Sequence, residues 1–156
     1  MRDATVNFHR TGEVIRSLDG FVAVATASTP NGLAGFAAST VLEASERPFS
    51  LLVCIDVVEQ PNAFLDVGSR VCLNFFRRTQ RADFSTFRSV SLSMKERFAA
   101  TEWTFGQAGI PELDGAALHV ECRVLTMKQL YRLIALECLV SPADPDDLGS
   151  YDEWTA

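Results

Sequence analysis

Histidine, closely spaced cysteine and positive charge are all scarce in this sequence. The 156 residues contain only His9 and His119, and the four cysteines are widely spaced, so no metal site is predicted. Fourteen basic residues stand against 20 acidic ones, a net charge of −6 that argues against a nucleic-acid surface. No apolar run is as long as a membrane span, and no signal-peptide core follows the N-terminus. We therefore expect a cytoplasmic protein with neither nucleic acid nor membrane as a partner.

The short motifs that mark common enzymes are also missing. The chain has no phosphate-binding Walker loop, no dinucleotide-binding G-x-G-x-x-G, no nucleophile elbow and no HExxH helix. His119 and Glu121 alternate onto one face of a predicted strand and could form a pair, but the sequence favours an ordinary surface or interface histidine, since no nucleophile accompanies it. We therefore assign no catalytic acid or base. The cysteines lie in apolar or alternating runs, which favours buried thiols in a reducing compartment.

Strand patterns dominate the remaining sequence. Two short strands, 21–28 and 33–40, flank the turn signal Pro30-Asn31-Gly32 and predict a hairpin. Further strands are expected over 49–55, 71–76, 117–126 and 130–140, the first of these buried on both faces. Short helices are expected over 8–18, over 61–68, after Thr79 and over 95–99. The expected fold is mainly β: a closed or split barrel over 1–140 with two or three short helices, followed by an acidic tail over 141–156.

Five pieces of sequence occur in a characteristic order. They are Gly20–Thr26, Gly35–Thr40, Leu51–Cys54, Val71–Phe76 followed by Gln80, and a last block with Gly109, Pro111, Leu113, Gly115, Ala116, Glu121, Cys122 and Val124. No single piece is specific, but the ordered set resembles the flavin-reductase-like domain family, whose members include reductase components of two-component flavin monooxygenases. The resemblance runs from about Phe8 to Val140 and implies an FMN-binding split barrel of Greek-key type that forms a homodimer.

The resemblance also implies which residues hold the flavin. Small residues let a backbone approach a ligand closely, and hydroxyls supply polar contacts. The residues expected at the cofactor are Ala37, Ala38, Ser39, Thr40, Cys54, Ile55, Asp56, Asn74, Phe75, Gln80 and Arg88. For individual members of this set, strand packing or a satisfied strand polar group is an equal alternative.

The chain departs from the family pattern at two places. The Gly-Asp-His segment that helps place the nicotinamide is replaced by Gln129-Leu130-Tyr131, so Tyr131 is the candidate for nicotinamide binding or, alternatively, a strand aromatic. Acidic Asp56 and Glu59 stand where the flavin phosphate is usually bound. Arg77, Arg78, Arg81 and Arg88 are nearby cations that could compensate, unless they form a solvated helix face.

Two functional hypotheses follow from the resemblance. The first is an NAD(P)H-dependent flavin reductase that uses FMN, or FAD, and supplies reduced flavin to a partner monooxygenase or another acceptor. The second is a flavin-binding dimer without reductase turnover, which the loss of Gly-Asp-His favours. Hydride transfer is the cofactors' own chemistry, so the first hypothesis needs no acid–base pair.

Overall fold

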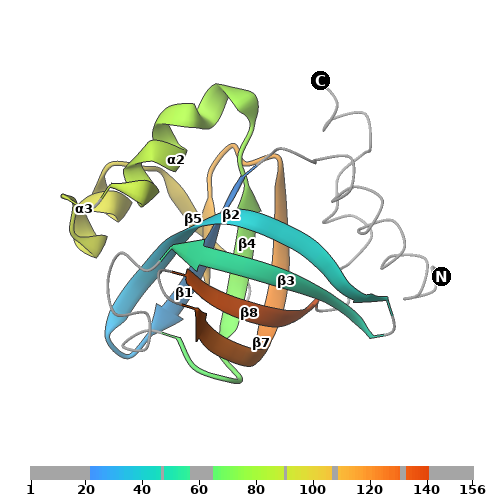
Figure 1. Ribbon diagram of the computed structural model, residues 1–156. Coiled ribbons are helices and arrows are strands. Elements are labelled where there is room, and N and C mark those ends of the chain that lie inside the picture. The colour runs from blue at the N-terminus through green and yellow to red at the C-terminus, as the bar shows by residue number, and fades with distance from the viewer. Residues whose placement is uncertain are drawn as a thin grey trace.

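The computed structural model describes residues 22–46, 48–56, 65–89, 91–106, 109–130 and 133–140. These residues form a closed barrel with the strand order β1-β2-β3-β8-β7-β4 and a separate two-stranded sheet, β5-β6 (Figure 1). The mainly β barrel expected from the sequence is therefore confirmed. No helix within the described ranges is long and apolar enough to cross a membrane.

Antiparallel pairing joins every neighbouring pair of barrel strands. The strands are β1 (Ala23–Thr29), β2 (Gly32–Glu46), β3 (Phe49–Asp56), β4 (Arg70–Phe75), β7 (Leu118–Leu130) and β8 (Leu133–Val140). The β1–β2 hairpin turns at Pro30-Asn31, between the paired residues Thr29 and Gly32, and Gly32 has φ 113°, a conformation that glycine adopts without strain. The predicted strands are thus confirmed, although β2 continues six residues past Thr40 along β3.

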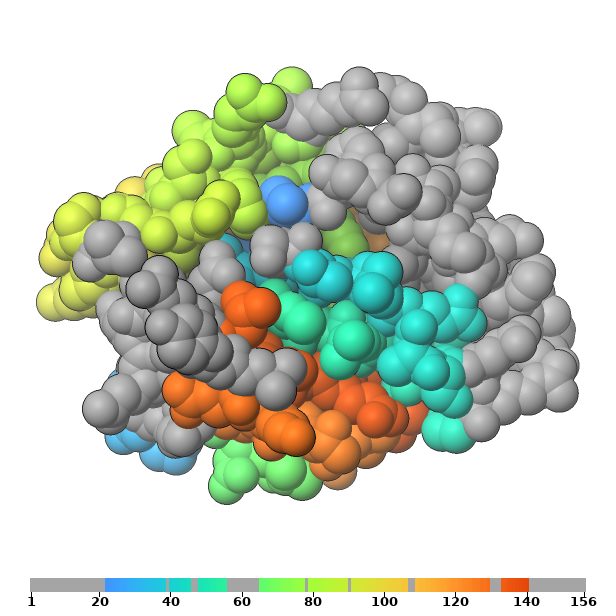
Figure 2. All heavy atoms as spheres, in the orientation of Figure 1, coloured from blue at the N-terminus to red at the C-terminus, as the bar shows by residue number. Residues whose placement is uncertain are grey.

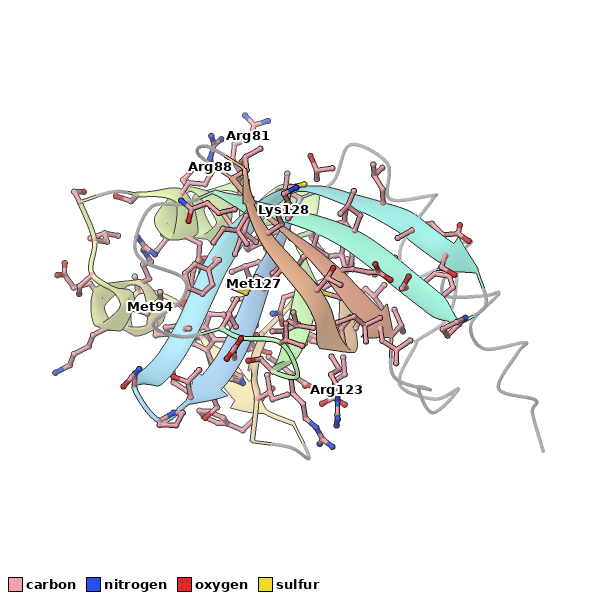
Figure 3. The ribbon with its side chains drawn as sticks, turned by 60° about the horizontal axis from the view of Figure 1, so that its bottom comes forward. Arg81, Arg88, Met94, Arg123, Met127 and Lys128 are labelled. Carbon is pink, nitrogen blue, oxygen red and sulfur yellow. The ribbon has the colours of Figure 1, made fainter. Side chains whose placement is uncertain are left out.

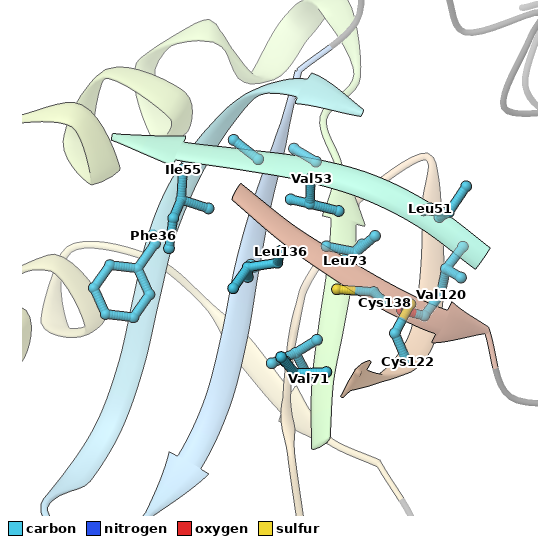
Figure 4. Packing of buried hydrophobic residues seen from close by; sticks show 14 of the residues in the cluster. Phe36, Leu51, Val53, Ile55, Val71, Leu73, Val120, Cys122, Leu136 and Cys138 are labelled. Carbon is cyan, nitrogen blue, oxygen red and sulfur yellow. The ribbon is translucent and has the colours of Figure 1, made fainter. Parts of the chain in front are cut away.

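Alternate side chains of each strand fill the barrel. Leu51, Val53 and Ile55 point inward from β3, and Leu136 and Cys138 point inward from β8, all of them at most 1% exposed (Figure 4). Leu52 and Cys54 face the other way and are only half-buried. The prediction that 49–55 is buried on both faces is therefore wrong: β3 belongs to a barrel, whose outer face is not covered at every position.

A second layer covers the outer face of β1, β2 and β4. It consists of the short helix η2 (Arg78–Gln80), α2 (Arg81–Arg88) and α3 (Met94–Ala99), together with β5 (Trp103–Phe105) and β6 (Pro111–Leu113). Phe87 seats α2 on β2 so closely that a Cβ on Gly35 would lie 2.6 Å from its ring. Glycine at position 35 therefore allows the helix to approach the barrel.

The other sequence predictions have mixed outcomes. Helices after Thr79 and over 95–99 are confirmed, whereas β5 and β6 were not anticipated, because each is only three residues long. The helix expected over 61–68 is wrong in its described part, since residues 65–68 form a loop and a turn that bring Gly68 to Val124. The helix over 8–18 and the tail over 141–156 lie outside the described residues. The division into 1–140 and 141–156 stays a prediction.

Candidate functional site

One end of the barrel gathers residues that are far apart in sequence. Cross-strand pairing joins Phe75 to Ala23, Ala23 to Ala38, Ala38 to Ile55 and Ile55 to Ile134 in one row. Three residues expected at the flavin, Ala38, Ile55 and Phe75, therefore share this row. Their side chains are at most 2% exposed and belong to the barrel core. Only their backbones are in a position to meet a ligand.

The adjacent row faces outward. Thr40 lies opposite Cys54, Cys54 opposite Ala135, and Ala135 opposite Lys128. Thr40, Cys54 and Ala135 are half-buried, and Lys128 is exposed at the end of the row. Figure 2 shows β2, β3 and β8 in cyan, green and orange across the middle of one face of the molecule. Of the predicted cofactor set, Thr40 and Cys54 therefore have side chains that can reach a bound group.

A register shift between these two rows frees backbone groups. Ala38 pairs with Ile55 and Thr40 pairs with Cys54, so Ser39 has no partner in β3. Such bulges leave one residue out of the ladder and are over-represented next to active sites. A flavin ring would need backbone donors and acceptors at its polar edge, and the bulge leaves the backbone of Ser39 outside the ladder beside the small residues Ala37 and Ala38. Asp56, the last residue of β3, lies opposite Leu133 in the same region.

Ala37 faces the helical layer and not this outward row. Its side chain is 3% exposed and packs with Val24, Phe76, Phe87 and Leu113. A ligand at the bulge would therefore meet the backbone of Ala37, while its methyl group holds the second layer in place.

Asn74 has a structural role in this fold. Its side chain is fully buried and bridges β1 and β6: Nδ2 donates to the Val24 carbonyl and to Thr26 Oγ1, and Oδ1 accepts from the Leu113 N–H. Thr26 donates in turn to the Pro111 carbonyl at 2.6 Å. Because these bonds use both ends of the amide, Asn74 is satisfied within the protein. Its sequence-predicted contact with the cofactor has no support in this geometry.

His119 belongs to the same hydrogen-bonded group of residues as Asn74. Its Nε2 lies 2.8 Å from the Leu113 carbonyl oxygen, and the register places it opposite Asn74. The alternative of an ordinary, structurally satisfied histidine is therefore the one that the contacts favour.

Gln80 connects the start of α2 to the turn before β7. Its Nε2 donates to the Asp114 carbonyl, its Oε1 accepts from the Arg77 N–H, and Arg77 Nε donates to the Gly115 carbonyl. Gly115 has φ 76°, which suits glycine at this turn. Gln80 therefore positions the turn before β7 with both ends of its amide, and its contact with the flavin stays a prediction.

Two exposed arginines lie on α2. Figure 3 shows Arg81, Arg88 and Lys128 toward the same end of the molecule, and the two arginines are the first and the last residue of the helix. The guanidinium of Arg88 also lies 5.6 Å from the centroid of the Phe84 ring. These side chains are candidates for binding a phosphate, and Lys128 is an exposed cation that the sequence pattern did not single out. Its place depends on the β7–β8 register, which shifts at a bulge between Val124 and Thr126.

The proposed nicotinamide contact, Tyr131, lies outside the described residues. It is one of the two residues connecting β7 to β8, whose last pair is Leu130 with Leu133. Leu133 in turn pairs with Asp56. The connection therefore starts and ends at the barrel end that carries the bulge.

The cysteines divide into one half-buried and three buried thiols, all free. Burial raises the pKa of the Cys72 thiol, with Glu112 and Glu121 adding to the effect, and burial likewise raises the pKa of Cys122. Burial, and secondarily Glu137, raises the pKa of Cys138 to about 12. Because the thiolate is the reactive form, these three residues are inert packing groups, as the sequence predicted.

The family model for the flavin reductase like domain matches residues 15–138, which include the row, the bulge and the β7–β8 connection. The chain belongs to this family. The FMN reductase (NADH) RutF of Stutzerimonas stutzeri is 33% identical over 112 residues, covering 72% of this chain and 64% of that protein. RutF of Pseudomonas syringae pv. syringae is 34% identical over 113 residues, covering 72% of this chain and 62% of that protein. The matched region thus covers slightly less than two thirds of the length of these relatives.

Solved structures agree with this assignment. A protein from Haemophilus somnus 129PT assigned as a flavin reductase superposes with a TM-score of 0.68 and 26% identity, covering 83% of this chain and 84% of that one. The styrene monooxygenase flavin reductase of Pseudomonas putida S12 superposes with a TM-score of 0.65, covering 81% and 80%. Its 22% identity supports the shared fold alone.

Proposed function

We propose that this protein is an NAD(P)H-dependent flavin reductase that uses FMN. The observation that carries the proposal is the gathering of the Ser39 bulge, Thr40, Cys54 and Asp56 at one barrel end in a member of this family. The RutF relatives, named as NADH-dependent FMN reductases, support FMN over FAD and NADH over NADPH. A bound flavin would accept a hydride from the reduced nicotinamide and pass the electrons on.

The chain's own residues would supply binding and orientation. Backbone groups at the bulge would meet the polar edge of the flavin ring, Thr40 would offer a hydroxyl, and Cys54 would pack against the ring. Arg88 and Arg81 would neutralise the phosphate, for which guanidinium groups are well suited. Tyr131 would stack on the nicotinamide in place of the family's histidine. No side chain is required to transfer a proton.

The two-fold dimer expected from the resemblance has a suitable surface. The outward face of β2, β3 and β8 carries Leu42, Leu52, Cys54, Ala135 and Leu139, and Leu42 is 54% exposed. We propose that a second copy covers this face and completes the flavin slot, since closed two-fold dimers are the commonest assemblies. Sedimentation should then give about 34 kDa, twice the chain mass of 17.1 kDa. A monomer at micromolar concentration would contradict this assembly, and Leu52→Lys should produce one.

A reduced-flavin acceptor, such as a monooxygenase component, is the partner that we propose. Structural relatives named as reductase components of styrene monooxygenase and of a tryptophan halogenase support this partner class only through their shared fold. The free state of all four cysteines supports a reducing compartment, and we propose the cytoplasm.

Absorbance and turnover measurements test the proposed activity. The purified protein, reconstituted with FMN, should show a perturbed flavin spectrum and should oxidise NADH in an FMN-dependent manner. A perturbed spectrum without oxidation of NADH or NADPH at saturating FMN would instead establish the flavin-binding alternative. Unperturbed FMN in the presence of excess folded protein would contradict both hypotheses.

A further inference from the structure

Two arginines lie directly opposite one another at the barrel end away from the candidate site. Arg70 on β4 pairs in register with Arg123 on β7, and both side chains are exposed. Figure 3 shows Arg123 at the opposite end of the molecule from Arg81 and Arg88. Like charges directly opposite one another in an antiparallel pair are destabilising. A negative charge close to this pair would therefore stabilise the fold.

In the described part of the chain, the carboxylates of Asp66 and Glu137 have other partners: Asp66 Oδ1 accepts from the Val67 N–H, and Glu137 Oε1 accepts from Ser50 Oγ. Glu121 lies on the same face of β7, but its Oε1 is 3.8 Å from where a Cβ on Gly106 would be, next to the Glu112 carboxylate. Its carboxylate is thus directed toward the β5–β6 hairpin. Among the described residues, neither Arg70 nor Arg123 takes part in an ion pair.

Two exposed apolar residues lie close to these arginines along the chain. Val67 is 59% exposed and Leu125 is 36% exposed. The turn that carries Val67 is joined to β7 at this point, since the Gly68 N–H donates to the Val124 carbonyl at 2.8 Å and the Val124 N–H donates to the Ser69 carbonyl at 2.9 Å. We call Val67, Arg70, Arg123 and Leu125 the arginine patch. It combines positive charge with apolar area, so it suits an acidic segment that also carries large apolar side chains.

The chain itself contains such a segment. Five of the 20 acidic residues and no basic residue lie in 141–156, so the first 140 residues carry 15 acidic and 14 basic side chains. The segment also contains Leu148, Tyr151 and Trp154. The net negative charge of −6 therefore arises almost entirely from the last 16 residues, which contribute −5.

The register of β8 places the start of this segment beside the patch. Leu139 lies opposite Arg123, and Val140, the last residue of β8, lies opposite Cys122. Asp144 follows Leu139 by five residues, which an extended chain spans in about 17 Å. A tethered segment of this length has an effective local concentration on the order of millimolar, so weak individual ion pairs suffice for docking.

We propose that the acidic C-terminal segment, residues 141–156, docks on the arginine patch of its own chain. Its carboxylates separate and neutralise the two opposed guanidinium groups, while its apolar side chains cover Val67 and Leu125. Heteronuclear NOE values of the backbone amides, measured on the full-length 15N-labelled protein, test this proposal because they report the fast motion of each amide. Amides of 144–153 should be ordered at low salt and should become mobile at about 1 M salt, where the Debye length is about 3 Å.

Matched variants identify the docking site. Arg70→Gln combined with Arg123→Gln should release the segment at low salt. Arg70→Lys combined with Arg123→Lys keeps the charge and should retain most of the order. Lys95→Gln, which removes an exposed cation on α3, should change nothing. Equal mobility of the segment in the wild-type protein and the glutamine variant would overturn the proposal. Order that rises with protein concentration would overturn it too, because it would place the segment on another chain.

Melting temperatures provide a second, independent measurement on full-length chains. When the five tail carboxylates are replaced by their amides, the opposed arginines are left uncompensated, so the melting temperature should fall. In that background the double glutamine variant should raise it, because repulsion is removed. In the background of the native tail the same double variant should lower it or leave it unchanged. The same increase in both backgrounds would show that the segment does not neutralise the pair and would overturn the proposal.

Discussion

Asn74 Oδ1 on β4 accepts a hydrogen bond from the backbone N–H of Leu113 on β6, at 2.9 Å. The amide of the same side chain donates to β1, so one residue connects two barrel strands to the outer hairpin. This hairpin leads directly into the turn that Arg77 and Gln80 hold. The family motif around Pro111 and Leu113 thus attaches the β5–β6 hairpin, and the turn that follows it, to the barrel beside the candidate site.

Replacing Asn74 with alanine should lower stability. The change leaves the buried Leu113 N–H and the Val24 carbonyl without their partner, and each such loss costs about 1–3 kcal/mol. Chemical denaturation should therefore show a loss of roughly 2–4 kcal/mol, given those unpaired groups. FMN affinity of the folded fraction should stay within about twofold, about 0.4 kcal/mol. A large loss of FMN affinity with unchanged stability would instead show that Asn74 contacts the cofactor.

A bulky side chain should act differently on the two faces of β2. Ala38 is fully buried in the barrel, so Ala38→Leu overpacks the core and should cost about 1–3 kcal/mol of stability. Thr40→Leu alters the outward row and should weaken FMN binding by more than tenfold, about 1.4 kcal/mol, with little change in melting temperature. Thr126→Leu, an exposed position on β7, is the control. If all three variants bind FMN with the same affinity, the flavin does not bind at this row.

Arg88→Gln should discriminate between flavins with and without a phosphate. If the guanidinium neutralises the phosphate, FMN affinity should fall several-fold while riboflavin affinity stays unchanged. The effect should shrink at high salt, because exposed charges are screened. Parallel fluorescence titrations of FMN and riboflavin measure this, with Lys95→Gln as the matched control. An equal loss for both flavins would place Arg88 at the ring or assign it to packing on Phe84.

Tyr131→Ala should raise KM for NADH if the ring stacks on the nicotinamide. A stacking contact serves the ground state and the transition state alike, so its loss appears mainly in KM and leaves FMN affinity intact. If the tyrosine instead packs within the protein, the variant should lose a few kcal/mol of stability, as is usual for truncated core side chains. Steady-state kinetics and melting temperature on the same variant separate these outcomes.

Thiol reactivity should follow burial. A thiol reagent at mildly alkaline pH should modify at most Cys54 in the native protein, where the proposed dimer contact and bound FMN would slow the reaction, and all four cysteines only after denaturation. The raised pKa of Cys138 also makes stability depend on pH. Its contribution is constant below the ordinary value of 9.0 and is lost progressively up to about 12, because the unfolded state releases its proton first. Rapid native modification of two or more thiols would contradict the described packing.

Local patterns in the sequence were sufficient to predict most of the fold. Alternation placed Leu118, Val120, Cys122 and Val124 on one face of β7, and the Pro30-Asn31-Gly32 signal located the first hairpin, because side-chain period and turn chemistry are local properties. The ordered motifs indicated the family, and with it the barrel.

Only the tertiary structure decided which predicted site residues can face a ligand. Ala38 and Thr40 stand two positions apart, where simple alternation puts both on one face. The bulge at Ser39 instead turns Ala38 into the core and Thr40 outward. The polarity of Asn74 indicated a site, but its partners, Val24 and Leu113, are 50 and 39 residues away in sequence. Register and long-range hydrogen bonding arise from the closure of the barrel, which the residues of a single strand do not specify.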